Sequence, residues 1–85
     1  MSKPVRLSGH AYGQLTRRGV SEEEVIETIR TSPWQPAELG RQGCRQDFVY
    51  GREWNGKFYE TKQVRPIFVE EADEIVVVTV YSYYF

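Results

Sequence analysis

The C-terminal stretch Glu74–Phe85 is the most apolar part of the chain and reads Glu-Ile-Val-Val-Val-Thr-Val-Tyr-Ser-Tyr-Tyr-Phe. It has no glycine, no proline and no charge after Glu74, and β-branched or aromatic residues fill almost every position. This composition predicts a central strand buried on both faces. Because side chains alternate along a strand, one face is expected to carry Val76, Val78 and Val80, and the other Val77, Thr79, Tyr81 and Tyr83.

The N-terminal third predicts two helices after a short extended stretch at positions 4–7. The first helix is expected from His10 to Arg18, with Ser8 as its N-cap and Gly19 as the residue that ends it. Its buried stripe is predicted to contain Ala11 and Leu15, with Tyr12 as a further candidate.

The second helix has the clearest signals in the sequence. Ser21 followed three positions later by Glu24 is a capping box, and Ser32-Pro33 ends the helix. Val20 before the cap is expected to pack on Val25. The apolar face is predicted to contain Val25, Ile26 and Ile29.

Positions 32–43 have the prolines and glycines of a loop, in which Trp34 and Leu39 are expected to anchor onto the core. Strands are predicted at positions 44–52 and 57–69, joined by a tight turn at Asn55-Gly56. Pro66 inside the second of these strands indicates a bulge or an unpaired edge position.

Together these elements predict a single α+β domain over residues 1–85. Two N-terminal helices would pack on one face of a three- to four-stranded antiparallel sheet, leaving the other face free for a ligand or partner. A chain of 85 residues has room for one small core only.

Charge and cysteine content narrow the class of protein. The formal net charge is −1, from 11 basic and 12 acidic residues, so the chain as a whole does not attract nucleic acid. The charges alternate in blocks, and a basic patch would form if the blocks at positions 1–20 and 41–65 meet in space; otherwise they are solvated faces. The single Cys44 and single His10 exclude a common Cys/His zinc site. We expect no metal, no cofactor, no membrane segment and a cytoplasmic location.

Several motifs together resemble domain-of-unknown-function family 4258: Ser8-Gly9-His10-Ala11, Arg17-Arg18-Gly19-Val20-Ser21-Glu22-Glu23, Phe68-Val69-Glu70-Glu71 and Val76-Val77-Val78-Thr79-Val80-Tyr81. The resemblance spans nearly the whole chain. It implies a RelE/ParE-like fold, in which two helices precede an antiparallel sheet, and a toxin-like domain of a toxin–antitoxin system. Fold kinship does not by itself fix an activity, because one fold hosts several functions.

Metal-independent RNA cleavage needs a base, an acid and cations that stabilise the charged phosphorane. His10 is the first candidate for base or acid, since only histidine titrates near neutrality unperturbed. Arg18 is a candidate phosphate clamp and Tyr81 a candidate phenolic acid, so the candidate catalytic residues are His10, Arg18 and Tyr81. Candidate nucleic-acid-binding residues are Arg17, Arg45, Lys62 and Arg65. Lys62 and Arg65 are predicted on opposite faces of the sheet.

Each of these residues also has a plain structural interpretation. His10 would bond a backbone group, the arginines would lie on solvated surfaces, and the tyrosines would belong to the core and its rim. The sequence therefore leaves two functions open. One is a metal-independent endoribonuclease toxin acting on mRNA, with an antitoxin protein as partner. The other is a non-catalytic interaction module, toxin-derived or ParE-like, that binds a partner through the open sheet face as a monomer or homodimer.

Overall fold

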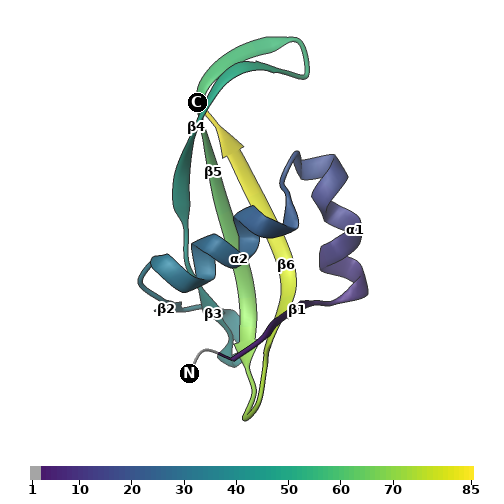
Figure 1. The fold of residues 1–85 in the computed structure, drawn as a ribbon, viewed down its shortest axis with the longest axis vertical. Coiled ribbons are helices and arrows are strands. Elements are labelled where there is room, and N and C mark those ends of the chain that lie inside the picture. Colours follow the sequence, from purple (N-terminus) through teal and green to yellow (C-terminus); the bar gives the residue numbers. More distant parts are fainter. Residues whose placement is uncertain (1–2) are drawn as a thin grey trace.

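The computed structural model describes residues 3–85, which form two α-helices packed on a six-stranded mixed sheet (Figure 1). The elements in chain order are β1 (Val5–Leu7), α1 (Gly9–Arg18), α2 (Glu22–Thr31), β2 (Gln35–Pro36), the 3₁₀ turn η1 (Glu38–Gly40), β3 (Gln42–Gly43), β4 (Gln46–Trp54), β5 (Lys57–Glu70) and β6 (Ile75–Tyr84). The α+β class is confirmed. The predicted sheet was too small and too uniform, because β1 joins β6 in parallel and β2 and β3 add two short strands.

Local capping signals determine both helices. Ser8 Oγ accepts a hydrogen bond from Ala11 N at 3.1 Å and starts α1, and Gly19, with φ 68°, ends it in the left-handed conformation. Ser21 and Glu24 form the predicted capping box at the start of α2. The Asn55-Gly56 turn is also confirmed, since both residues have the positive φ values, 50° and 84°, that this turn requires.

The central strand is β5 and not the C-terminal strand that the sequence indicated. β5 pairs with β6 along one side and with β4 and β3 along the other. Within residues 3–85, β6 has a second neighbouring strand only where β1 pairs with Ile75–Val77. Pro66 is tolerated inside β5 because β4 pairing stops at Val64 and β3 pairing starts at Ile67, so no ladder bond to its nitrogen is needed.

A β-bulge at Val78 overturns the predicted alternation along β6. Ile67 is paired with Thr79 while the next residue, Phe68, is paired with Val77, so Val78 is the extra residue on β6. As a result Val77 and Val80 are both fully buried in one core cluster, whereas strict alternation would have put them on opposite faces.

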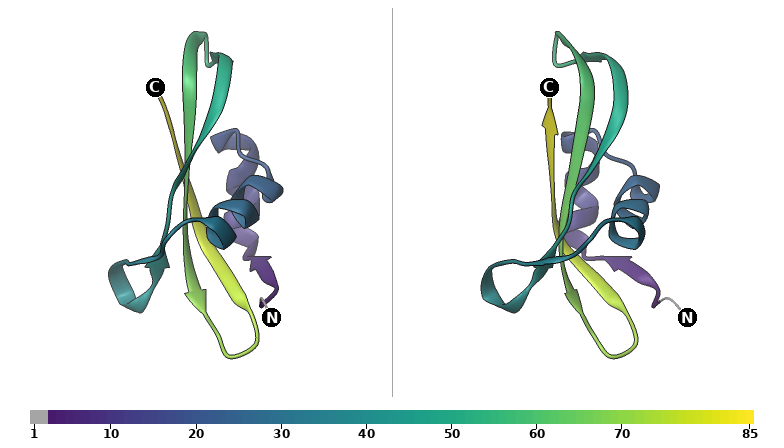
Figure 2. Two further views of the ribbon diagram at one scale, coloured as in Figure 1. Left: turned by 60° about the vertical axis from the view of Figure 1, so that its left-hand side comes forward. Right: turned by 90° about the vertical axis from the view of Figure 1, so that its left-hand side faces the viewer.

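Both helices cover the same face of the sheet, as predicted (Figure 2). The core between them and the sheet contains Ala11, Val20, Val25, Ile29, Cys44, Val64, Phe68, Ile75, Val77 and Val80. The segment Gln35–Gly43, which we name the arm, lies on the side of the sheet opposite the helices. It covers one end of that opposite face (Figure 2). The opposite face is thus only partly free.

Two side chains, Tyr12 and Leu39, differ from their predicted environment. Tyr12 is exposed on α1, and Gln14 takes a buried place on that helix. Leu39 at the tip of the arm is 84% exposed and anchors nothing, whereas Trp34 packs edge-on against Phe68 as expected. Neither helix of residues 3–85 is long and apolar enough to cross a bilayer.

Candidate nucleic-acid interface on the open sheet face

The face of the sheet opposite the helices is here named the open face. The residues on it can be identified because side chains alternate along the strands, so the neighbours of a buried residue point to the opposite face. Val64 and Val80 point into the core, so their neighbours Arg65 and Tyr81 point to the open face. Tyr83 follows Tyr81 on the same face, and Val49 lies on it in β4 opposite Thr61. The exposed side chains of this face are therefore mostly aromatic, apolar or arginine.

Tyr81 is the centre of this surface because two guanidinium groups lie over its ring. The Cζ atom of Arg18 is 5.8 Å from the ring centroid, and that of Arg65 is 6.0 Å from it. Arg65 is the residue directly opposite Tyr81 on β5, whereas Arg18 reaches it from the last residue of α1. Three candidate residues from distant parts of the sequence are thus brought together.

The end of α1 is held against the edge of β6 by hydrogen bonds, and this places Arg18. Its carbonyl oxygen accepts bonds from Ser82 Oγ at 2.8 Å and from Tyr84 Oη at 2.6 Å. These bonds satisfy a carbonyl at the negative end of the helix. Gln14 acts one turn earlier, where its Oε1 accepts bonds from Val80 N at 2.9 Å and from Thr79 Oγ1 at 3.0 Å.

The Nε atom of Arg18 is buried and has no hydrogen-bond acceptor within the part of the chain that the structure describes. A buried donor without a partner costs on the order of 1–3 kcal/mol. This arginine is therefore held over Tyr81 at some cost in stability, which favours a functional reason for its position.

Two hollows flank the arm on the open face and share Arg65 as a common wall. The first has a volume of about 420 Å³ and is bordered by Arg45, Gln63 and Tyr83. The second has about 560 Å³ and is bordered by Leu39, Arg41, Thr79 and Tyr81. Three arginines and a single acid, Glu38, line the two hollows, so this surface is locally basic although the whole chain is not.

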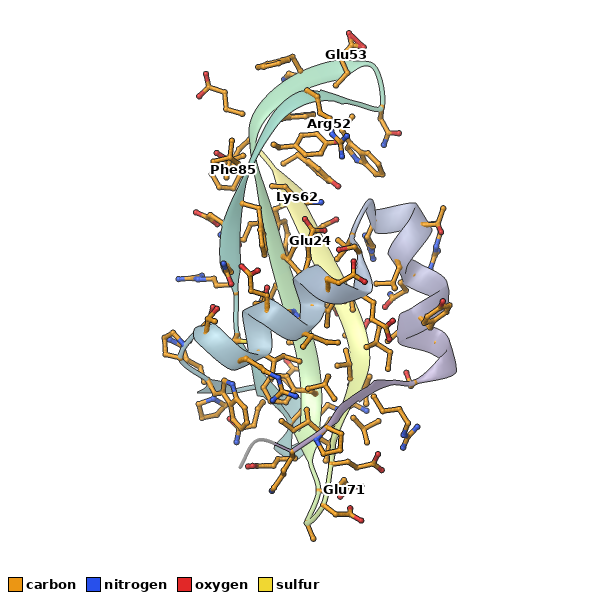
Figure 3. All side chains as sticks on the ribbon, in the orientation of Figure 1. Glu24, Arg52, Glu53, Lys62, Glu71 and Phe85 are labelled. Carbon is orange, nitrogen blue, oxygen red and sulfur yellow. The ribbon has the colours of Figure 1, made fainter. Side chains whose placement is uncertain are left out.

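Lys62 does not belong to this surface. It is 4% exposed on the helix side of the sheet, where its Nζ donates to Glu24 Oε1 and to Gly19 O, each at 2.8 Å (Figure 3). The predicted opposition of Lys62 and Arg65 holds. The placement of Lys62 is that of a structural cation that joins β5 to the turn between α1 and α2.

His10 and Arg17 are also separate from the Tyr81 cluster. His10 lies in the first turn of α1 and is exposed, and Arg18 is the last residue of the same helix. Eight residues of α-helix correspond to a rise of about 12 Å. Arg17 is exposed at the end of α1. The structure therefore groups Arg18, Arg65 and Tyr81, adds Arg45 at the next hollow, and leaves His10, Arg17 and Lys62 elsewhere.

The remaining aromatic residues form a second cluster under the β4–β5 hairpin. Tyr84 stacks on Trp54 with ring centroids 4.9 Å apart and contacts Tyr50 and Tyr59 at 5.2 and 5.8 Å. Burial is the main cause that raises the pKa of the Tyr84 phenol. This cluster anchors the hairpin over the end of α1, and it does not contribute to the open face.

Arg41 and Leu39 were missed as site residues by the sequence analysis. Arg41 follows a glycine within a loop, and the sequence contained no signal that the arm folds back over the sheet. Among residues 3–85 no group of three or more His, Cys, Asp or Glu side chains is placed to hold a metal ion. Burial raises the pKa of the Cys44 thiol to about 11, which makes this cysteine a poor nucleophile.

Comparisons with protein-family models, with curated proteins and with solved structures found no match to this chain.

Proposed function

We propose that this protein binds single-stranded RNA through the open face of its sheet. The observation that carries the proposal is the pair of guanidinium groups, from Arg18 and Arg65, that lie over the exposed ring of Tyr81. Proteins that bind single strands combine aromatic rings, on which bases stack, with cations along the path of the backbone. The two hollows beside Tyr81 and Tyr83 supply the concave part of such a path.

The same geometry supports binding better than cleavage. Arg18 and Arg65 are suited to hold the charge of a phosphate, and the Tyr81 phenol is suited to donate a proton. Cleavage also needs a base that removes the proton of the 2′-hydroxyl. His10, the sequence candidate for that role, lies in the first turn of α1 and not beside Tyr81.

Kinship with family 4258 and with RelE/ParE-like toxins is a further part of the proposal. Its support is the order of the elements, since α1 and α2 precede the antiparallel strands β4, β5 and β6. In a toxin–antitoxin pair, an antitoxin that covers the open face would exclude RNA from it. Endoribonuclease activity on mRNA would then require another molecule, the ribosome for example, to supply the missing catalytic groups.

A second function, binding of a protein partner, is favoured by the apolar residues of the open face. Val49 is 98% exposed and Phe85 is 58% exposed, and neither contributes charge for a phosphate. Tyrosine and arginine are also the residue types enriched at protein interfaces. A partner that covers Val49 and Phe85 would use the same surface without needing RNA.

Binding of a fluorescently labelled single-stranded RNA, measured by anisotropy over a range of salt concentrations, tests the proposal. The wild type is expected to bind with an affinity that falls steeply as salt increases, because the arginines displace counterions from the phosphates. Arg65→Gln and Tyr81→Leu should each weaken binding by about 5- to 100-fold. Arg17→Gln, which removes the same charge from an exposed position outside the cluster, should change the affinity by less than about 3-fold.

The result that would overturn the RNA-binding function is an affinity that none of these substitutions changes, or no binding at low salt. Retention of a protein partner by the wild type and its loss in Val49→Asp, with no RNA binding, would support the second function. Incubation of the RNA with the protein, followed by gel analysis, separates binding from cleavage in the same samples.

A further inference from the structure

The larger hollow lies between the tip of the arm and Tyr81 and has a volume of about 560 Å³. This is within the range of hollows that hold small ligands, and a single nucleobase occupies only part of it. Its charged side chains are of two kinds. Glu38 supplies a carboxylate, and Arg41 and Arg65 supply guanidinium groups.

We propose that this hollow binds a guanine base of the RNA, a proposal that rests on RNA binding by the open face. Guanine has two acceptor atoms, O6 and N7, on one edge, and arginine donates to this pair more often than to any other base edge. On its Watson–Crick edge guanine has two neighbouring donors, the N1–H and N2–H groups, which match the two oxygens of a carboxylate. The side chains of Arg41 and Glu38 are the complementary pair.

The other bases match this set less well. Uracil has one N–H donor between two carbonyl oxygens, and those oxygens would face the Glu38 carboxylate. Cytosine and adenine each have a single exocyclic amino group, so each would leave one carboxylate oxygen without a partner. The expected order of affinity is therefore guanine first, then adenine and cytosine, then uracil. Tyr81 provides the ring on which the base stacks.

The backbone at the tip of the arm is the second observation that points to a ligand. Leu39 has φ 62° and ψ 34°, a left-handed conformation that is costly for leucine, and its side chain is 84% exposed. Neither stability nor solubility explains a leucine here, because glycine would adopt this backbone without strain. A leucine that borders the hollow together with Tyr81 would cover the second face of a stacked base.

The test compares oligouridine strands that carry a single central guanosine, adenosine or cytidine with an unmodified oligouridine, by competition against one labelled RNA. The wild type is expected to bind the guanosine strand at least about 10-fold more tightly than oligouridine. Glu38→Gln should remove that preference. Because the substitution also removes a negative charge from a basic surface, it should leave the affinity for oligouridine unchanged or slightly higher.

Leu39→Gly separates a ligand contact from a structural role. If Leu39 covers the base, this variant should lose most of the guanosine preference and melt at a higher temperature than the wild type, because glycine relieves the left-handed strain. Phe58→Ala, which removes an exposed apolar side chain on the β4–β5 hairpin outside the hollow, should leave the preference unchanged. Circular dichroism checks that each variant is folded.

The outcomes distinguish this inference from the proposed function. Equal binding of all four strands by the wild type would overturn the guanine pocket while leaving RNA binding in place. A guanosine preference that persists in Glu38→Gln would overturn the role of the carboxylate and with it the proposed guanine pocket. No binding of any strand at low salt would overturn both.

Discussion

Lys62 Nζ lies 2.8 Å from Glu24 Oε1, and Lys62 is the one charged residue that is buried within residues 3–85. It also donates to Gly19 O at 2.8 Å, the carbonyl of the residue that ends α1. One ammonium group therefore stabilises both the negative end of α1 and the capping box of α2. The Tyr50 ring, with its centroid 5.5 Å from Nζ, closes the site from the side of the hairpin.

Replacement of Lys62 by methionine is expected to lower the free energy of unfolding by about 1–3 kcal/mol. The methionine keeps most of the volume but removes the Nζ donor from Glu24 and from the Gly19 carbonyl, which leaves Glu24 with the Ser21 N–H and Gly19 with only the long bond from Tyr84 Oη. Urea denaturation at neutral pH measures the change. Lys57→Met, at the exposed tip of the hairpin, is the control and should change stability by less than about 0.5 kcal/mol. Equal effects of the two substitutions would contradict a structural role for Lys62.

Gly19→Ala should be among the most destabilising single substitutions in the protein. Gly19 has φ 68°, and a Cβ atom there would lie 2.6 Å from Trp54 and still closer to Tyr84. We expect a loss of more than about 2 kcal/mol, since the alanine adds both backbone strain and a clash with the aromatic cluster. Thermal melting measures it.

Gly56→Ala is the matched control for this substitution. Gly56 also has a positive φ, 84°, but a Cβ atom at this position meets nothing within 4 Å. Its cost should be that of the backbone conformation alone, about 1 kcal/mol. A similar loss of stability in the two variants would show that the aromatic cluster rearranges to accommodate the added methyl group.

Short-range signals explain what the sequence predicted well. The Ser21–Glu24 capping box and the Asn55-Gly56 turn depend on residues within three or four positions of each other, and both occur as expected. The bulge at Val78 could not be predicted in the same way. It lies in a run of β-branched residues with no polar position to mark a change of face, and it is determined by pairing with β5.

The residues of the candidate site could be predicted from the sequence, but their convergence in space could not. Arg18, Arg65 and Tyr81 were all identified as candidates from their residue types. Their convergence depends on the register that puts Arg65 opposite Tyr81 and on the hydrogen bonds that hold the end of α1 to β6. Lys62 was placed with the site because a lysine on a strand is usually solvated, and only the tertiary structure provides its buried partners.

The buried thiol of Cys44 predicts a specific loss of stability at alkaline pH. Burial raises its pKa to about 11 from the value of 9.0 for an unburied thiol, which applies to the unfolded chain. Below the pKa of the thiol in the unfolded chain, Cys44 is protonated in both states, and its full contribution to the free energy of unfolding is present. As pH rises toward 11 only the unfolded state ionises, so the contribution, up to about 3 kcal/mol, is lost.

Cys44→Ala isolates this effect from the tyrosines and lysines that titrate in the same range. The variant should be less stable at neutral pH because it leaves a small cavity. The difference in unfolding free energy between wild type and variant should then shrink as the pH approaches 11, as measured by urea denaturation in a series of buffers. A difference that is constant with pH would show that the thiol is accessible to solvent in the folded state.

Gln14 protects the edge of β6, and its removal should affect both stability and association. Gln14 Oε1 accepts the hydrogen bond that Val80 N would otherwise give to another strand, and it also accepts a bond from Thr79 Oγ1. Gln14→Leu would leave a buried N–H group without an acceptor, at a cost of about 1–3 kcal/mol. It would also uncover a strand edge, and uncovered edges pair with other chains.

We therefore expect Gln14→Leu to unfold at lower urea concentration and to show concentration-dependent association by analytical ultracentrifugation. Gln63→Leu is the control, because Gln63 lies on the open face and donates only to the exposed Asp47, at 2.9 Å. It should change stability by less than about 0.5 kcal/mol. If Gln14→Leu is destabilised but stays monomeric at all concentrations, α1 itself covers the edge of β6 and the amide serves only to satisfy Val80. If its stability is unchanged, the amide does not cap Val80 in solution.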